Sequence, residues 1–321
     1  MVFLQRHEMI VDYKPELDTT FVEILRGQKN GVPVLIVDEN YNKDFRDDPI
    51  REYKSIVWGA KPDLIPCEYD IFNGEKMVRD SSWLRIGDAS GSTLIGKYEH
   101  HLGAFNLENE SFSIATIEPF TGSSFAYLMI SPKISIYSKL GEKKDSIGER
   151  DILGLGEVLD FNGKFYRFEG VTNDGGYVTL VKDLPLSEKI GTQIGMKAPD
   201  FSVVSTQGEK LTSRQLQDKI TVVANSCRCG GDIESMQAVE DIKETFGDAI
   251  HVLQIDNAIK DDLNTYQIDT EIKENKAFNE VYRKTYCSRT VYVIGKDQKL
   301  LDKFKVYDWK QYLPELISQN P

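Results

Sequence analysis

The stretch "TVVANSCRCGGDIESM" (residues 221–236) places two cysteines one residue apart, between an apolar run and a polar segment that opens with two glycines. The β-branched apolar run predicts a buried strand. Beyond the glycines, apolar side chains recur at steps of three and four residues, which predicts a helix that ends at Gly247. These apolar positions are Ile233, Met236, Val239, Ile242 and Phe246. The cysteines therefore fall where a strand gives way to a helix.

A thiol at such a junction lies near the positive end of the helix dipole and near free backbone N–H groups. Both stabilise the thiolate, lower the thiol pKa and make the sulfur nucleophilic. Gly230 and Gly231 would let the chain turn sharply without covering the sulfur of Cys229. The chain has only four cysteines, too few for a disulfide framework at 321 residues. A close pair among so few favours redox or metal chemistry.

Strand and helix signals alternate around this stretch. "DFSVVSTQGEKLT" predicts a hairpin, "AIHVLQIDN" a strand, "KAFNEVYRKTY" a helix and "TVYVIGKDQKLLDKFKV" a pair of strands. "YDWKQYLPELI" predicts a C-terminal helix whose Trp309 and Leu313 close the core. The alternation predicts a layered α/β domain.

The first half of the chain is predicted to be β-rich. "GVPVLIVDEN" indicates a buried strand, and "FNGKFY" predicts a hairpin through Asn162-Gly163. We expect a sandwich or an open barrel here. Glycines and a proline without periodicity mark the boundary near residue 190. The prediction is thus an α+β protein of two domains, 1–190 and 191–321.

Charge and hydropathy exclude several classes of function. The formal net charge of −12 argues against nucleic acid and anionic membrane surfaces, which are bound through lysine and arginine. No apolar run approaches the roughly 18 residues that suggest a membrane span. We expect neither nucleic acid nor a membrane span among its partners.

The C-terminal part resembles the thioredoxin-like redoxins, the superfamily of thiol-disulfide oxidoreductases and peroxiredoxins. "IGMKAPDFSVVSTQGEKLTSRQLQDKITVVANS" is similar to their entry segment and "TVYVIGKDQKLL" to their late strand. The resemblance implies that Cys229 is the nucleophile. Asp232 stands where the family has its second cysteine, and Arg289 stands where thioredoxins have a proline. An arginine at that point stabilises the thiolate in peroxiredoxins.

The sequence leaves alternatives open for the role of each residue. Either Cys227 or Cys287 could resolve the mixed disulfide formed by Cys229, and Asp232 could accept a proton or cap the helix. The expected function is a thiol-disulfide oxidoreductase without a cofactor for its redox chemistry. Its partners would be protein thiols, protein disulfides or another redoxin. The rivals are a non-catalytic redoxin-fold scaffold and a copper-binding or other soft-metal protein.

An acidic loop, "DENYNKDFRDDP", follows the strand "VPVLIV". Its alternating side-chain oxygens resemble the first half of an EF-hand loop, which predicts a structural Ca²⁺. The candidate ligands are Asp38, Asn40, Asn42, Asp44, Asp47 and Asp48. Secreted or lipid-anchored redoxin proteins of bacteria carry a similar loop, so the resemblance implies a periplasmic or cell-surface location. A cytoplasmic location is the alternative, because no leader is visible.

Overall fold

The computed structural model describes residues 21–57, 60–73, 75–98, 101–107, 110–117, 132–137, 149–227, 232–256, 266–283 and 287–320. By its internal contacts the chain divides into two compact units. The first unit comprises Met1–Ser146, Asp151–Glu157 and Arg167–Val181, and the second Ile147–Arg150, Val158–Tyr166 and Lys182–Pro321.

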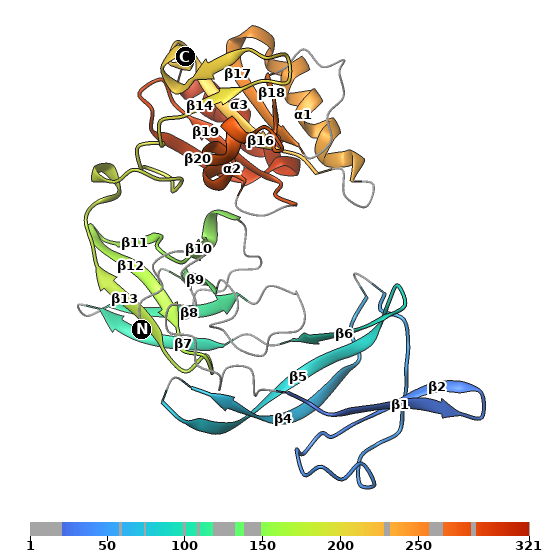
Figure 1. The fold of residues 1–321 in the computed structure, drawn as a ribbon. Helices are drawn as coiled ribbons and strands as arrows, with labels where there is room; N and C mark the ends of the chain where they lie inside the picture. The colour runs from blue at the N-terminus through green and yellow to red at the C-terminus, as the bar shows by residue number, and fades with distance from the viewer. Residues whose placement is uncertain are drawn as a thin grey trace. The chain divides into compact units, whose positions relative to one another are not determined.

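The described part of the first half consists of small β-sheets (Figure 1). Two sheets are antiparallel and follow the chain order: β1–β2–β3 (Ile24–Lys29, Val32–Val37, Arg51–Glu52) and β4–β5–β6 (Leu64–Phe72, Met77–Ala89, Ser92–Lys97). A third is built in the order β10–β9–β8–β7 (Ile152–Gly154, Lys133–Tyr137, Glu110–Ile117, Leu102–Leu107). A fourth is β11–β12–β13 (Val158–Phe161, Lys164–Val171, Val178–Lys182). The β-rich prediction for this half is confirmed.

The turn between β11 and β12 has the backbone conformation that its Asn-Gly sequence predicts. Asn162 and Gly163 have φ values of 54° and 83°, so both lie in the left-handed region. A two-residue hairpin turn that matches strand twist needs this conformation at both positions, and Asn-Gly adopts it with little strain. The predicted hairpin through Asn162-Gly163 is confirmed.

Strand β2 was predicted to be buried, and its burial is one-sided instead. Leu35 and Val37 are 2% and 0% exposed, whereas Val32 is 44% exposed. Successive side chains of a strand point to opposite faces, and only one face of β2 contacts the core of this unit.

The second unit is built on a five-stranded sheet with β16 (Ile220–Asn225) in the middle. β17 (Ile250–Asp256) and β18 (Tyr266–Asp269) extend it in parallel on one side. β19 (Thr290–Ile294) and β20 (Leu300–Lys305) extend it in antiparallel fashion on the other. The hairpin β14–β15 (Ser202–Val204, Lys210–Thr212) precedes the sheet. Both this hairpin and the layered α/β prediction are confirmed.

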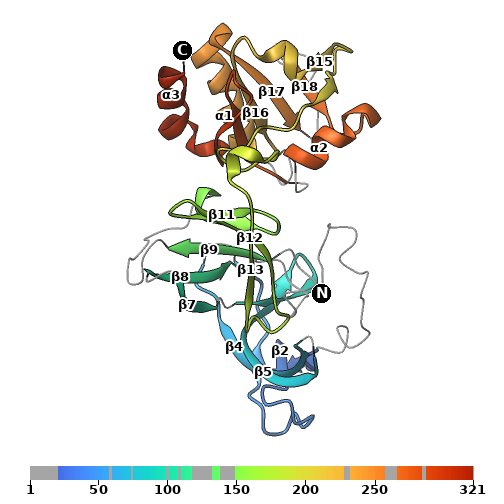
Figure 2. The same ribbon diagram turned by 90° about the vertical axis from the view of Figure 1, so that its left-hand side faces the viewer.

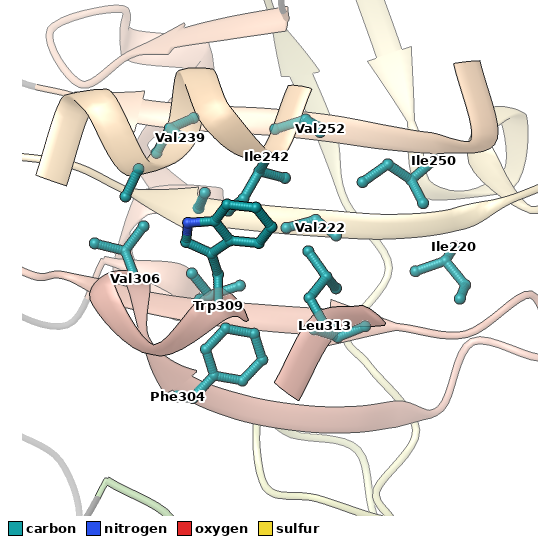
Figure 3. Packing of buried hydrophobic residues seen from close by; sticks show 14 residues of the cluster. Ile220, Val222, Val239, Ile242, Ile250, Val252, Phe304, Val306, Trp309 and Leu313 are labelled. Atoms are coloured by element: carbon teal, nitrogen blue, oxygen red, sulfur yellow. The ribbon is translucent and has the colours of Figure 1, made fainter. Parts of the chain in front are cut away.

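Helices cover both faces of this sheet (Figure 2). One face packs against α1 (Ile233–Phe246) and α3 (Trp309–Gln319), and the shared core is drawn in Figure 3. The other face packs against α2 (Lys276–Tyr282) and the β14–β15 hairpin. In the described part of the chain, no helix is long and apolar enough to cross a membrane.

The buried stripe of α1 differs at its start from the predicted stripe. Ile233, expected to face the core, is 71% exposed, and Ser235 is fully buried instead. The helix begins at Ile233, and its cap Asp232 receives a hydrogen bond from the Ser235 amide. The apolar face contacts the sheet only from Ala238 onward.

Candidate redox site

Two cysteines meet where β16 ends and β19 begins. The register pairs Ala224 with Val291 in antiparallel fashion, so the residues that follow β16 lie beside those that precede β19. Cys227 and Cys287 occupy these positions, and their sulfur atoms are 3.0 Å apart. A disulfide bond length is about 2.05 Å, so a shift of about 1 Å would join them.

The backbone of Cys227 is bound to the first turn of α1. Its amide donates to the Ser235 hydroxyl at 3.1 Å, and both residues are fully buried. The N-terminus of α1 therefore lies close to Cys227.

Asn225 connects the end of β16 to the segment that carries Cys287. Its side-chain amide nitrogen donates to the carbonyl oxygens of Tyr282 and Thr290, each at 2.8 Å. Asn225 is fully buried, and its bond to Tyr282 is buried while its bond to Thr290 is partly buried. One side chain thus holds Tyr282 and Thr290, which flank Cys287 in the chain, at the end of β16.

An ion pair between Asp232 and Arg289 holds the same loop against α1. Asp232 accepts from the Ser235 amide at 3.1 Å and from the Tyr307 hydroxyl at 2.8 Å. Arg289 also donates to the carbonyl oxygen of Cys287 at 3.1 Å. The cluster therefore runs from the helix cap to the backbone of Cys287.

The charges of this cluster shift its pKa values. Burial alone would raise the pKa of Asp232, but hydrogen bonds from Ser235, Tyr307 and Arg289 outweigh it and hold that pKa below its usual range. Burial, together with the hydrogen bond to Asp232, raises the pKa of Tyr307 to about 12. At neutral pH, Tyr307 is therefore a proton donor to a charged Asp232.

A buried polar network surrounds Ser226, the residue before Cys227. The Ser226 hydroxyl donates to the Asp256 carboxylate and accepts from the Gln254 amide at 3.0 Å. Arg283 donates to the carbonyl oxygen of Ile255 at 3.0 Å. These bonds satisfy polar groups that would otherwise be costly to bury, and they fix the end of β16 in place.

The structure brings four of the predicted site residues together: Cys227, Cys287, Arg289 and Asp232. Cys229, predicted as the nucleophile, lies outside the described residues. Asp232 occupies the N-cap position of α1, and Arg289 is directed to Asp232 and the Cys287 carbonyl.

Two residues of the site escaped the sequence analysis. Asn225 carries no pattern beyond its place at a strand end. Tyr307 is 75 positions away from Asp232 along the chain, and only the fold brings them together.

Cys67, in the first unit, is by contrast an inert thiol. It is 1% exposed in the core of the β4–β5 region. Burial raises its pKa to about 12. A thiol that stays protonated and covered does not take part in exchange.

The acidic loop of the first unit closes on itself. Asp38 is fully buried, and its two carboxylate oxygens accept from the backbone amides of Asn42 and Lys43 at 3.0 and 2.9 Å. Asp47 accepts from the side-chain amides of Asn40 and Asn42. Asp44 pairs with Arg46, and Asp48 accepts from the Glu39 amide through one oxygen, while its other oxygen is buried without a hydrogen-bond partner.

These bonds bear on the predicted calcium site, because the oxygens that would bind the ion mostly accept hydrogen bonds already. Within the described residues, no group of three or more His, Cys, Asp or Glu side chains is placed to hold a metal ion. Calcium binding by this loop stays a prediction.

The sulfur spacing lies between the values for a disulfide bridge and for a bound metal ion. Two thiolates on a tetrahedral zinc ion would lie roughly 3.8 Å apart, given a Zn–S distance of about 2.3 Å. The sulfur atoms of Cys227 and Cys287 are 3.0 Å apart, so they would move together by about 1 Å to form a disulfide or apart by about 0.8 Å to bind zinc. The spacing by itself favours neither.

Comparisons with known proteins give structural likenesses only. No family model and no curated protein matches the chain. A thiol:disulfide interchange protein from a Bacteroides species is 12% identical, with a TM-score of 0.33, over 39% of this chain and 90% of that one. The thioredoxin domain of a thiol-disulfide oxidoreductase from Bacteroides vulgatus is 11% identical, with a TM-score of 0.33, over 39% and 97%. A thioredoxin-like protein from Bacteroides caccae is 16% identical, with a TM-score of 0.33, over 42% and 52%.

The depressed pKa of Asp232 predicts a pH-dependent contribution to stability. The folded state binds this proton less readily than the unfolded state, so the contribution is complete above the unfolded pKa of about 3.9 and is lost as the pH falls through the folded pKa. Asp232→Asn keeps a good N-cap residue but removes the charge. We expect the difference in unfolding free energy between the wild type and this variant to be constant from about pH 5 to 8 and to shrink below about pH 4. Urea unfolding at each pH measures it, and an equal difference at pH 3 and 7 would contradict the assignment.

Proposed function

We propose that this protein is a thiol-disulfide oxidoreductase whose redox couple is Cys227 and Cys287. The observation that carries the proposal is the 3.0 Å separation of their sulfur atoms at the N-terminus of α1. The couple cycles between two thiols and one internal disulfide, and the two electrons pass to or from a disulfide in a partner protein. No cofactor takes part in this exchange.

The surroundings of the pair support exchange over a purely structural bridge. Cys287 is half-buried rather than enclosed, and it lies in a loop held by side chains rather than in a strand. The periplasmic or cell-surface location remains a prediction, and disulfide exchange between secreted proteins would suit it.

Titration of the whole chain against glutathione buffers of known ratio tests the proposal. We expect one reversible bridge, which peptide mass spectrometry maps to Cys227 and Cys287, while Cys67 remains reduced throughout. Cys227→Ser and Cys287→Ser should each abolish the bridge. The control Cys67→Ser should leave its midpoint unchanged.

Two results would count against the proposal. If Cys227 and Cys287 stay unbridged across the whole range, the second unit is a scaffold without redox activity. If the bridge that forms joins Cys227 to Cys229 instead, the couple has been assigned to the wrong residues.

A further inference from the structure

The two thiols of the proposed couple differ in their access to a partner. Cys227 is 0% exposed, as are its neighbour Ser226 and its hydrogen-bond partner Ser235. Cys287 is half-buried, in the loop that precedes β19. Exchange begins when a thiolate reaches a sulfur of the partner's disulfide, so access decides which cysteine meets the partner.

The backbone of Cys287 is also held in place by the side chains of the ion-paired cluster. Arg289 donates to its carbonyl oxygen at 3.1 Å and is ion-paired with Asp232. Asp232 is fixed in turn by the Ser235 amide at 3.1 Å and by the Tyr307 hydroxyl at 2.8 Å. These bonds hold Cys287 in a partly exposed position next to Cys227. The buried sulfur of Cys227 lies 3.0 Å from the sulfur of Cys287.

We infer that Cys287 is the cysteine that attacks the partner and that Cys227 is the buried thiol that resolves the mixed disulfide. This inference rests on the proposed function and differs from the sequence prediction, in which Cys229 attacks and either Cys227 or Cys287 resolves the mixed disulfide. It gives the buried cysteine a role that needs no contact with the partner.

The chemistry proceeds in two balanced exchanges. The Cys287 thiolate attacks one sulfur of the partner's disulfide, a Cys287–partner S–S bond forms, and the other partner sulfur leaves as thiolate. Cys227 then gives its proton to the partner thiolate released in the first exchange and attacks the Cys287 sulfur. The Cys227–Cys287 bond forms, the partner's second thiolate is released, and the partner has gained the two electrons that the dithiol has lost.

The reduced wild-type protein provides a first test without any substitution. Brief treatment with iodoacetamide, followed by peptide mass spectrometry, compares the labelling rates of the cysteines. We expect Cys287 to react at least tenfold faster than Cys227, with Cys67 as the slow internal reference. Equal rates at Cys227 and Cys287 would overturn the assignment.

Trapping with oxidised glutathione provides the second test. In Cys227→Ser the resolving thiol is missing, so a glutathione adduct should accumulate on Cys287. In Cys287→Ser the adduct on Cys227 should form at least tenfold more slowly. Both variants are prepared with and without Cys229→Ser. Cys227→Ala and far-UV circular dichroism control for misfolding around the buried position.

The outcomes separate this inference from the proposed function. If the wild type forms the Cys227–Cys287 bridge and the adduct collects on Cys287, both hold. If the bridge forms but the adduct in Cys227→Ser collects on Cys229, the order of attack is wrong and the couple stands. If the wild type forms no internal bridge, the proposed function fails and this inference fails with it.

Discussion

Replacement of Asn225 by aspartate is expected to separate Cys227 from Cys287 and to destabilise the second unit strongly. The amide of Asn225 donates to the carbonyl oxygens of Tyr282 and Thr290, and aspartate has no donor for either. An orphaned buried carbonyl costs about 1–3 kcal/mol, and the Thr290 carbonyl is only partly buried, so we expect a loss of at least about 1–3 kcal/mol. A carboxylate facing two carbonyl oxygens would also push Tyr282 and Thr290 away from β16.

Two measurements check this prediction. Denaturant unfolding gives the loss of stability, and glutathione titration gives the equilibrium constant of the Cys227–Cys287 bridge, which should fall at least tenfold. Asn173→Asp is a matched control, because Asn173 is also fully buried and donates to the Phe72 carbonyl at 2.7 Å in the first unit. It should destabilise that unit and leave the bridge constant unchanged. A wild-type bridge constant in Asn225→Asp would show that the amide does not position the loop.

Replacement of Trp309 by alanine is expected to cost about 3–5 kcal/mol of unfolding free energy, the usual range for removal of a buried tryptophan. Trp309 is 5% exposed and lies in the core between α1, α3 and the sheet. Figure 3 shows its indole among Val222, Ile242 and Phe304. It also meets the Phe246 ring edge-on, with centroids 6.0 Å apart. Its loss would leave a cavity that the sheet cannot close.

Gln311→Ala is the control for this substitution, because Gln311 is exposed on the same helix and should change the unfolding free energy by less than about 0.5 kcal/mol. Trp309 begins α3 directly after the segment Val306–Asp308, which carries Tyr307. We therefore expect Trp309→Ala to loosen the Tyr307–Asp232 bond as well. A loss of less than about 1 kcal/mol would mean that α3 is not held by this residue.

The elements of the second unit were largely predictable because their signals are local. The apolar run before the cysteines is β16, the steps of three and four residues continue into α1, and Gly247 ends that helix as expected. Trp309 and Leu313 are buried in the core as predicted. The one-sided burial of β2 and the exposure of Ile233 were not foreseen, because burial depends on what packs against an element.

The site was predicted only in part, because local sequence does not show which distant residues come into contact. Local sequence brought Cys227 and Cys229 to attention as neighbours along the chain, whereas the structure places Cys287 beside Cys227. Arg289 was expected to serve a thiolate, and its guanidinium is bound to Asp232 and a backbone carbonyl. The donors to Asp232 come from three separate segments of the chain, and no sequence pattern predicts that these segments meet.

The sequence by itself determined which segments form strands, helices and turns, since hydrophobic period, capping and turn chemistry act over a few residues. It also narrowed the chemistry to thiols, since cysteines are sparse and cluster at a strand–helix junction. Only the tertiary structure decided which two sulfurs lie side by side and which of them is partly exposed. The register of β16 against β19, the donors of Asn225 and the burial of Cys227 set these properties, and each depends on residues that meet only when the sheet has formed.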